Sequence, residues 1–313
     1  MPTITDVPRM TLPELIHRFP TEEKCLAYLE HLRWGGKPVC PKCRKRDAVR
    51  VGGRDAVLRC RACNQQFTVR VGTVFHDSHL PLAKWFIAVY LLCESKKGIS
   101  ACQLHRMLGG SYKTAWYLFH RIRQAMMKGI GLDKLKGIVE IDDTWIGGKK
   151  PGIGRGGYRQ HKSVVIGMVE RGGRLQLAVL PDLTSKSIQK AVVQRISPHV
   201  DMIVSDELNA YVPALGPLYT KRYKRIKHAY TYVQGDVHTN TVEGTFSLLK
   251  RGIIGSWHHV SIKHLQRYLE EVAFRYSQRK NPALFSLTLK NLVSTGRITF
   301  KDLTAEPEEQ QAA

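Results

Sequence analysis

The chain has 313 residues and carries 49 lysines and arginines against 26 acids, so its formal net charge is +23. This excess predicts a polyanionic partner, either nucleic acid or an acidic membrane surface. Because no apolar run of about 18 residues occurs and the N-terminus lacks a signal-peptide pattern, we expect nucleic acid as the partner and the cytoplasm as the compartment.

Residues 1–36 predict a short helical segment. Thr21 precedes a run in which apolar residues from Cys25 to Leu32 recur at helical spacing, and its hydroxyl can cap that helix. Cys25 is explained as a small core residue of this run.

Four of the seven cysteines form two C-x2-C pairs, Cys40 with Cys43 and Cys60 with Cys63. Paired thiolates at such spacing close tetrahedral sites, so the pattern predicts a structural Zn²⁺ ion. A redox dithiol is the alternative, but it requires a βαβ unit around one of the pairs. The odd total of cysteines argues against a disulfide framework.

The segment between the cysteine pairs reads as two short strands around Gly52 and Gly53, which is typical of a zinc ribbon. From Lys37 to Arg70 there are ten basic residues and two acids. We therefore expect this module, over residues 37–72, to contact phosphates as well as to bind zinc.

Residues 73–131 are predicted to be helical. The run from Leu82 to Glu94 is almost wholly apolar and too short to cross a membrane, so we assign it to a core. A serine can cap a helix on either side of the Gly109-Gly110 break, which is the pattern of a helix-turn-helix. Any helical hairpin gives the same pattern, and the net charge favours the version that reads DNA. The caps are Ser100 and Ser111, and the candidate DNA contacts on the second helix are Lys113 and Arg121.

From about residue 132 the pattern changes from helical to alternating. A strand over residues 137–148 contains Glu140, Asp142 and Asp143, and alternation places the first two on one face and Asp143 on the other. A carboxylate within an apolar strand is costly unless it binds a metal or another partner. An edge strand with solvated acids is the alternative.

The elements that follow are two strands around Gly172-Gly173, a helix, a strand that ends at Asp206, a linker, a further strand, and a helix with Glu243 near its start. This order is that of a ribonuclease-H-like α/β fold. In such a fold Asp142, Asp206 and Glu243 converge at one sheet edge and can hold two divalent ions, Mg²⁺ or Mn²⁺, for in-line phosphoryl transfer.

Five motifs stand out together: the ribbon cysteines, VEIDDTWIGGKK, IVSDELNAY, HTNTVEGTFSLLKRGIIGSWHHVS and HLQRYLEEVAFRYSQRK. Together they resemble the insertion-sequence-1595 (ISXO2-like) family of bacterial DDE transposases, over nearly the whole chain. The resemblance implies that Asp142, Asp206 and Glu243 hold the metals and that Lys250 is the basic residue after the third acid. It also implies that Glu271 and Arg275 form a helical signature. Some members of the family carry Asn where the third acid is expected, so Asn240, one helical turn before Glu243, is the alternative third ligand.

Loop cations complete the expected DNA interface. Residues 147–162 include five basic residues, no acids and many glycines, which is typical of a flexible nucleic-acid clamp. The histidines of the fourth motif, His238, His258 and His259, are better explained as DNA contacts or as hydrogen-bonded loop residues than as ligands of a hard metal. The candidate DNA contacts are Lys113, Arg121, Lys149, Lys150, Arg155, Arg159, Lys162, His258 and Arg275.

The sequence therefore predicts a DNA transposase that binds terminal inverted repeats and catalyses metal-dependent strand cleavage and strand transfer. We expect it to act on double-stranded DNA in the bacterial nucleoid, as a homodimer or a higher synaptic oligomer. The alternatives are a zinc-ribbon DNA-binding regulator with a non-catalytic C-terminal domain and a structure-specific nuclease. The expected domains are an N-terminal helical segment (1–36), the zinc ribbon (37–72), the helix-turn-helix-like region (73–131), the ribonuclease-H-like catalytic domain (132–290) and a C-terminal tail (291–313).

Overall fold

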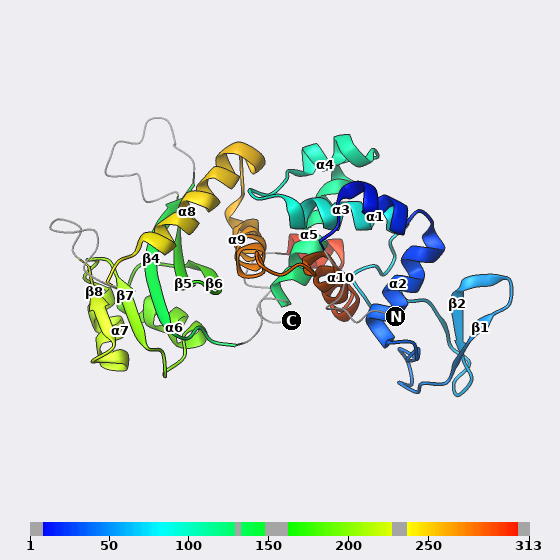
Figure 1. Ribbon diagram of the computed structural model, residues 1–313, viewed down its shortest axis with the longest axis horizontal. Coiled ribbons are helices and arrows are strands. Elements are labelled where there is room, and N and C mark those ends of the chain that lie inside the picture. Colours follow the sequence, from blue (N-terminus) through cyan, green and yellow to red (C-terminus); the bar gives the residue numbers. More distant parts are fainter. Residues whose placement is uncertain (1–8, 129–132, 148–161, 227–236, 306–313) are drawn as a thin grey trace. The chain divides into compact units, whose positions relative to one another are not determined.

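The computed structural model describes residues 9–128, 133–147, 162–226 and 237–305 (Figure 1). The chain divides into two compact units, one formed by residues 1–129 with 279–313 and the other by residues 130–278. The second unit thus ends at Gln278 and not at residue 290, where we expected the catalytic domain to end. Among the helices of the described residues, none is long and apolar enough to cross a membrane.

The first unit is mainly helical, and the C-terminal helices belong to it. Its helices are α1 (Leu12–Arg18), α2 (Glu22–Trp34), α3 (Leu82–Glu94), α4 (Ala101–Leu108), α5 (Tyr112–Lys128), α10 (Leu284–Ser294) and α11 (Phe300–Thr304). The expected caps are present, since the hydroxyls of Thr21, Ser100 and Ser111 accept hydrogen bonds from the backbone amides of Lys24, Gln103 and Thr114. Helix α10 packs against α2, α3 and α5.

An aromatic core explains why α10 joins the N-terminal helices. The ring of Phe86 lies 4.9 Å from that of Phe19 and 5.8 Å from that of Phe285 on α10. The Tyr28 hydroxyl donates a 2.8 Å hydrogen bond to Ser286. Residues that we had assigned to the catalytic domain and the tail therefore contribute to the core of the first unit.

The zinc ribbon forms a small antiparallel sheet with the order β1-β2-β3. Its strands are β1 (Ala48–Val51), β2 (Arg54–Cys60) and β3 (Gln66–Phe67). The two predicted strands around Gly52 and Gly53 are confirmed, and Gly53 takes the left-handed conformation that the tight turn requires (φ 71°). The third strand was not predicted because two residues give too short a pattern.

The second unit contains a five-stranded sheet with the order β6-β5-β4-β7-β8. Its strands are β4 (Ile138–Ile146), β5 (Ser163–Glu170), β6 (Leu175–Leu180), β7 (Met202–Ser205) and β8 (Tyr223–Arg225). Strands β4, β5 and β6 are antiparallel, whereas β4, β7 and β8 run parallel. All five strands were predicted, and the unit is of the mixed α/β class.

Helices cover both faces of this sheet and bury two apolar cores. Val139 and Ile141 of β4 belong to a core shared with α6 (Ser185–Arg195) and α7 (Tyr211–Tyr219). The core on the opposite face is shared with α8 (Asn240–Gly252) and α9 (Ile262–Ser277), as Figure 1 shows for α8. Alternation along β4 places Glu140 and Asp142 on the α8 face. Helix α7 was read as a linker, because Gly216 and Pro217 interrupt its helical pattern.

Helix α8 lies close to the sheet because Gly167 has no side chain. Gly167 pairs with Asp142 across β4 and β5. A Cβ atom on Gly167 would lie 2.8 Å from Cζ of Phe246 and 3.1 Å from Cγ2 of Val242, both on α8. The absence of a side chain at this position thus lets α8 approach Asp142.

We predict that Gly167→Ala lowers the free energy of unfolding by about 1–3 kcal/mol, because the new methyl group overpacks a buried contact. The matched control is Gly244→Ala on α8, where nothing lies within 4 Å of an added Cβ. Alanine favours a helix over glycine, so this control is expected to raise the free energy of unfolding by up to about 1 kcal/mol. Urea denaturation measures both, and equal effects of the two changes would contradict the close approach of α8.

Candidate functional site

Three carboxylates meet where strands β4 and β7 lie side by side. Each of Asp142, Asp143 and Asp206 offers one oxygen that lies within 4.8 Å of the other two. The parallel pairing brings these residues together, because Ile141 of β4 pairs with Ser205 of β7 and each of the two is followed by an aspartate. The expected convergence of Asp142 and Asp206 is therefore present in the fold.

Asp143 is the member of this cluster that the sequence did not assign as a ligand, because strand alternation turns it to the other face. Strand β7 ends at Ser205, so no β7 residue pairs with β4 beyond Ile141. Side chains from both faces of β4 can turn toward that open edge. The Tyr211 hydroxyl of α7 donates a 3.3 Å hydrogen bond to Asp143 Oδ1 and so fixes its carboxylate from the other face.

Burial and the neighbouring carboxylates raise the pKa of Asp142 to about 7. Burial is the largest cause, followed by the negative charge of Asp206; the charges of Asp143 and Glu243 add to it. A hydrogen bond from the Asp143 amide, 2.7 Å from Asp142 Oδ1, opposes the shift. Carboxylates held this close repel one another when ionised, and a divalent cation with oxygen ligands relieves that repulsion.

The third predicted acid lies in the first turn of α8. The side chains of Glu243 and Asn240 are exposed, and the Thr239 hydroxyl donates a 2.9 Å hydrogen bond to Glu243 Oε1. Glu243 is outside the group of three aspartates, although its charge contributes to the raised pKa of Asp142. Lys250 is exposed in the last turn of α8.

A fourth acid, Glu140, holds the start of α8 and was not predicted to do so. Its carboxylate is fully buried and accepts a 2.6 Å hydrogen bond from Arg171 Nε. It also accepts hydrogen bonds from the backbone amides of Thr241 (2.8 Å) and Val242 (3.1 Å). The signal in the sequence was an acid within an apolar strand and an arginine at the next hairpin turn, but only the fold brings them together.

Two predicted DNA contacts are buried, and these assignments are wrong. Arg121 is 3% exposed, donates a 2.8 Å hydrogen bond to the His76 carbonyl and stacks over Trp85. Arg275 is 8% exposed and pairs at 3.0 Å with the buried Glu271 carboxylate on α9. A helical pattern does not distinguish a cation that packs inside a unit from one that faces solvent.

The other predicted DNA contacts lie on the surface or outside the described residues. Lys113 is exposed, with its ammonium 5.1 Å from the Phe300 ring. His258 is exposed after the short π-helix Ile253–Trp257, and Lys162 is half-buried before β5. Outside the described residues are Lys149, Lys150, Arg155 and Arg159.

The four ribbon cysteines are placed as a zinc site requires. Their sulfur atoms all lie within 4.8 Å of one another, with Cys40 Sγ 3.6 Å from Cys63 Sγ and Cys43 Sγ 3.5 Å from Cys60 Sγ. Tetrahedral coordination with a Zn–S distance of about 2.3 Å separates neighbouring sulfurs by about 3.8 Å. The cysteine cluster therefore fits Zn²⁺.

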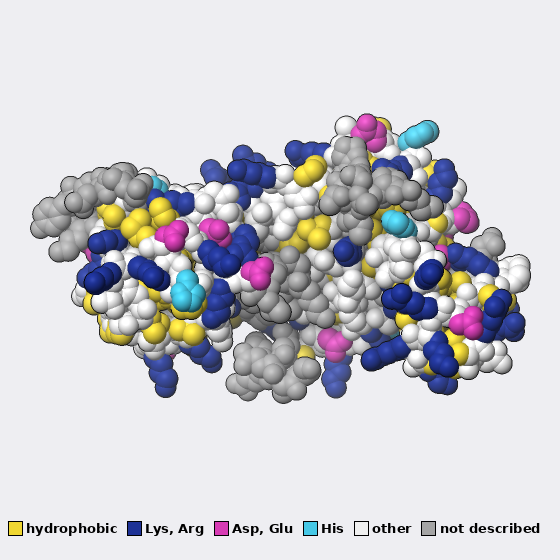
Figure 2. Space-filling model, turned by 60° about the horizontal axis from the view of Figure 1, so that its bottom comes forward, with side chains coloured by type: hydrophobic (Ala, Val, Ile, Leu, Met, Phe, Trp, Pro, Cys, Tyr) yellow, Lys and Arg dark blue, Asp and Glu magenta, His cyan; other side chains and the backbone are white. Residues whose placement is uncertain are grey.

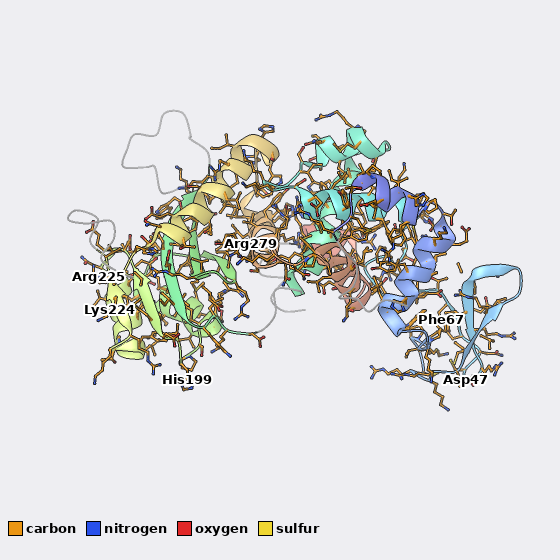
Figure 3. All side chains as sticks on the ribbon, viewed as in Figure 1. Asp47, Phe67, His199, Lys224, Arg225 and Arg279 are labelled. Carbon is orange, nitrogen blue, oxygen red and sulfur yellow. The ribbon has the colours of Figure 1, made fainter. Side chains whose placement is uncertain are left out.

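The two cysteine pairs sit on matching turns of the backbone. The amides of Arg44 and Asn64 each donate a 2.9 Å hydrogen bond to the carbonyl of the first cysteine in their pair. Both residues have a φ of 61°, which is uncommon for side chains other than glycine. Beside the turns, Phe67 (labelled in Figure 3) packs on a small core with Trp34, their ring centroids 5.9 Å apart. This repeated geometry aims all four thiols at one point.

We predict that the purified protein carries about one zinc ion per chain in its ribbon. Cys43→Ser removes one of four ligands and is expected to lower the zinc content to well under half and to expose the ribbon to protease. Cys102→Ser changes an exposed cysteine of α4 and serves as the control. Elemental analysis checks this; a Cys43→Ser protein with full zinc content would contradict it.

We also predict that Asp142→Asn stabilises the protein in magnesium-free buffer, and increasingly so as the pH rises. The pKa of Asp142 in the folded protein, about 7, lies above its ordinary value of 3.8, so the folded state loses stability as the pH rises from about 4 to 7. Asparagine removes this loss. The gain from the substitution is expected to grow by roughly 2 kcal/mol between pH 5 and pH 8. Urea denaturation at both pH values measures it, and a gain that does not change with pH would contradict the raised pKa.

Both the cysteine cluster and the aspartate cluster lie in regions of the chain that are similar to known protein families. A family model described as a transposase zinc-ribbon domain matches residues 20–66, and one described as an ISXO2-like transposase domain matches residues 134–277. A similar protein of Halobacterium salinarum, named as an uncharacterized protein in transposable element ISH50, is 29% identical over 303 residues, which cover 90% of this chain and 98% of that protein. The chain therefore carries two domains of the ISXO2-like (insertion-sequence-1595) transposase family, a zinc ribbon over residues 20–66 and a transposase domain over residues 134–277.

Proposed function

We propose that this protein binds the terminal inverted repeats of an insertion sequence, cleaves the strands at its ends and joins them to target DNA. The observation that carries this proposal is the group of three half-buried carboxylates at the ends of β4 and β7 in a chain with a net charge of +23. A strongly basic protein has reason to gather acids at one sheet edge if they hold the metals of phosphoryl transfer.

We propose a ribonuclease-H-like fold for the second unit. Its sheet order, β6-β5-β4-β7-β8, supports this, with three antiparallel strands followed by two parallel ones. The positions of the acids also support it, since Asp142 lies on the central strand β4, Asp206 follows β7 and Glu243 lies on α8, the helix that comes after β8.

In this proposal Asp142, Asp206 and Glu243 hold two Mg²⁺ or Mn²⁺ ions, with Asn240 as the alternative to Glu243. When bound, such ions activate water and stabilise the entering and leaving oxygens of an in-line displacement. The raised pKa of Asp142 means that its carboxylate gives up a proton when a cation arrives. Lys250, exposed on α8, is suited to position a phosphate.

The surface supplies cations for the DNA backbone. On the face drawn in Figure 2, lysine and arginine side chains clearly outnumber acids. Near the acidic cluster, Lys224 is exposed and Arg225 half-buried on β8, the strand beside β7 (Figure 3). We propose that these residues, the ribbon and the helix-turn-helix-like pair α4 and α5 with Lys113 contact double-stranded DNA, and that the chain acts as a homodimer or a higher synaptic oligomer.

The two alternatives fit less well. A regulator that only binds DNA has no need for three carboxylates that repel phosphates at one sheet edge. A structure-specific nuclease shares the metals but does not join strands, so its products distinguish it from a transposase. The basic surface alone separates neither alternative from the proposed function.

We predict that Asp142→Asn, Asp206→Asn and Glu243→Gln each lower magnesium-dependent cleavage of the element's ends at least about 100-fold, because each removes a charged metal ligand. The matched control is Glu207→Gln, which changes an exposed acid next to Asp206 and is expected to leave cleavage unchanged. A gel assay on labelled DNA ends measures the rates.

The same assay decides between the two candidates for the third ligand. Normal cleavage by Glu243→Gln together with loss of cleavage in Asn240→Ala would assign the ligand to Asn240. Strand-transfer products with target DNA support the transposase over the nuclease. Cleavage that needs no divalent metal, or that survives both aspartate substitutions, would refute the proposed function.

A further inference from the structure

The side chain of Glu140 is fully buried, and both of its carboxylate oxygens accept hydrogen bonds. Its Oε1 accepts from Arg171 Nε (2.6 Å) and from the Thr241 hydroxyl (2.9 Å). Its Oε2 accepts from the amides of Thr241 (2.8 Å) and Val242 (3.1 Å). Both oxygens of an ionised carboxylate can accept hydrogen bonds in this way, whereas the NH₂ group of an amide cannot.

These contacts replace the usual N-terminal cap of helix α8. The N-cap residue Thr239 makes no side-chain cap hydrogen bond. The first amides of a helix need acceptors, and a negative charge there is favoured by the helix dipole. For α8 that acceptor and charge come from Glu140, on the neighbouring strand β4.

Because Glu140 caps the helix, the Thr239 hydroxyl has a different partner. It is fully buried and donates its 2.9 Å hydrogen bond to Glu243 Oε1. Glu140 lies two residues before Asp142 on the same face of β4, and Glu243 directly follows Val242, whose amide Glu140 holds. One buried carboxylate therefore links the strand that carries Asp142 to the turn that carries Glu243.

Arg171 fastens the segment before the helix to the same point. Its NH2 nitrogen donates a 3.1 Å hydrogen bond to the carbonyl of His238, and the Nδ1 atom of His238 lies 3.2 Å from Glu140 Oε1. The backbone on both sides of Thr239 is thus held to the sheet through Glu140 and Arg171. Such a double attachment fixes the rotation of the first helical turn as well as its distance from β4.

We propose that Glu140 is a positioning residue that, with Arg171, caps α8 from the sheet so that the Thr239 hydroxyl orients Glu243 toward Asp142. This inference rests on the proposed function, since it takes Glu243 to be a metal ligand. Groups that orient metal ligands typically affect metal affinity by about 10–100-fold when removed.

Two substitutions and one control test the proposal by Mn²⁺ binding, measured by electron paramagnetic resonance, and by hydrogen exchange of the backbone. Glu140→Gln is expected to weaken Mn²⁺ binding by about 10-fold or more and to speed exchange in residues 240–245, with β5 and β6 unchanged. Thr239→Val is expected to weaken Mn²⁺ binding several-fold without faster exchange in α8. Glu170→Gln, in the half-buried pair with Arg174 on the β5–β6 hairpin, is the control and is expected to change neither.

The outcomes separate the inference from the proposed function. If the wild type cleaves DNA and both Glu140→Gln and Thr239→Val bind Mn²⁺ as tightly as the wild type does, the inference is overturned and the proposed function stands. If the wild type cleaves no DNA but the two substitutions weaken Mn²⁺ binding as expected, the positioning stands and the proposed reaction fails. Faster exchange throughout the second unit in Glu140→Gln, together with unchanged Mn²⁺ binding in Thr239→Val, assigns Glu140 a purely structural role. A wild type that binds no Mn²⁺ overturns both.

Discussion

Repulsion among carboxylates at the ends of β4 and β7 is the constraint on which the second unit depends. Asp142, Asp143 and Asp206 are brought together by the parallel pairing of two strands, and their partial burial reduces the screening of their charges by water. Burial, the largest cause, and this repulsion raise the pKa of Asp142 to about 7, so without a cation the Asp142 carboxylate holds a proton below that pH. The site therefore costs stability without a cation and is suited to bind one.

The residues around the cluster hold the neighbouring helix and the Asp143 carboxylate in place. Glycine at position 167 lets α8 approach the sheet, and Tyr211 holds Asp143 from the opposite side. Glu140 is an acid of the same strand with a different role, because Arg171 neutralises it and it accepts hydrogen bonds from the start of α8. Neighbouring acids of one strand are thus divided between holding a helix and, as we propose, holding metal.

The sequence predicted all five strands of the second unit because alternation and turn residues are local signals. It did not predict the capping role of Glu140 or the place of Asp143 in the cluster, since the first depends on how α8 packs on the sheet and the second on where β7 ends. Arg121 and Arg275 were assigned to DNA because helical spacing does not reveal which face a second helix will cover. The cysteine spacing was informative because zinc coordination restricts the geometry more than apolar packing does.

We propose that the aspartate cluster binds a divalent cation in exchange for a proton. Isothermal titration calorimetry of Mn²⁺ binding, repeated in buffers of different ionisation enthalpy, measures that exchange directly. With the pKa of Asp142 at about 7, we expect the release of about one proton per chain at pH 6 and little release at pH 8.5. Failure to bind Mn²⁺, or the same proton release at both pH values, would contradict it.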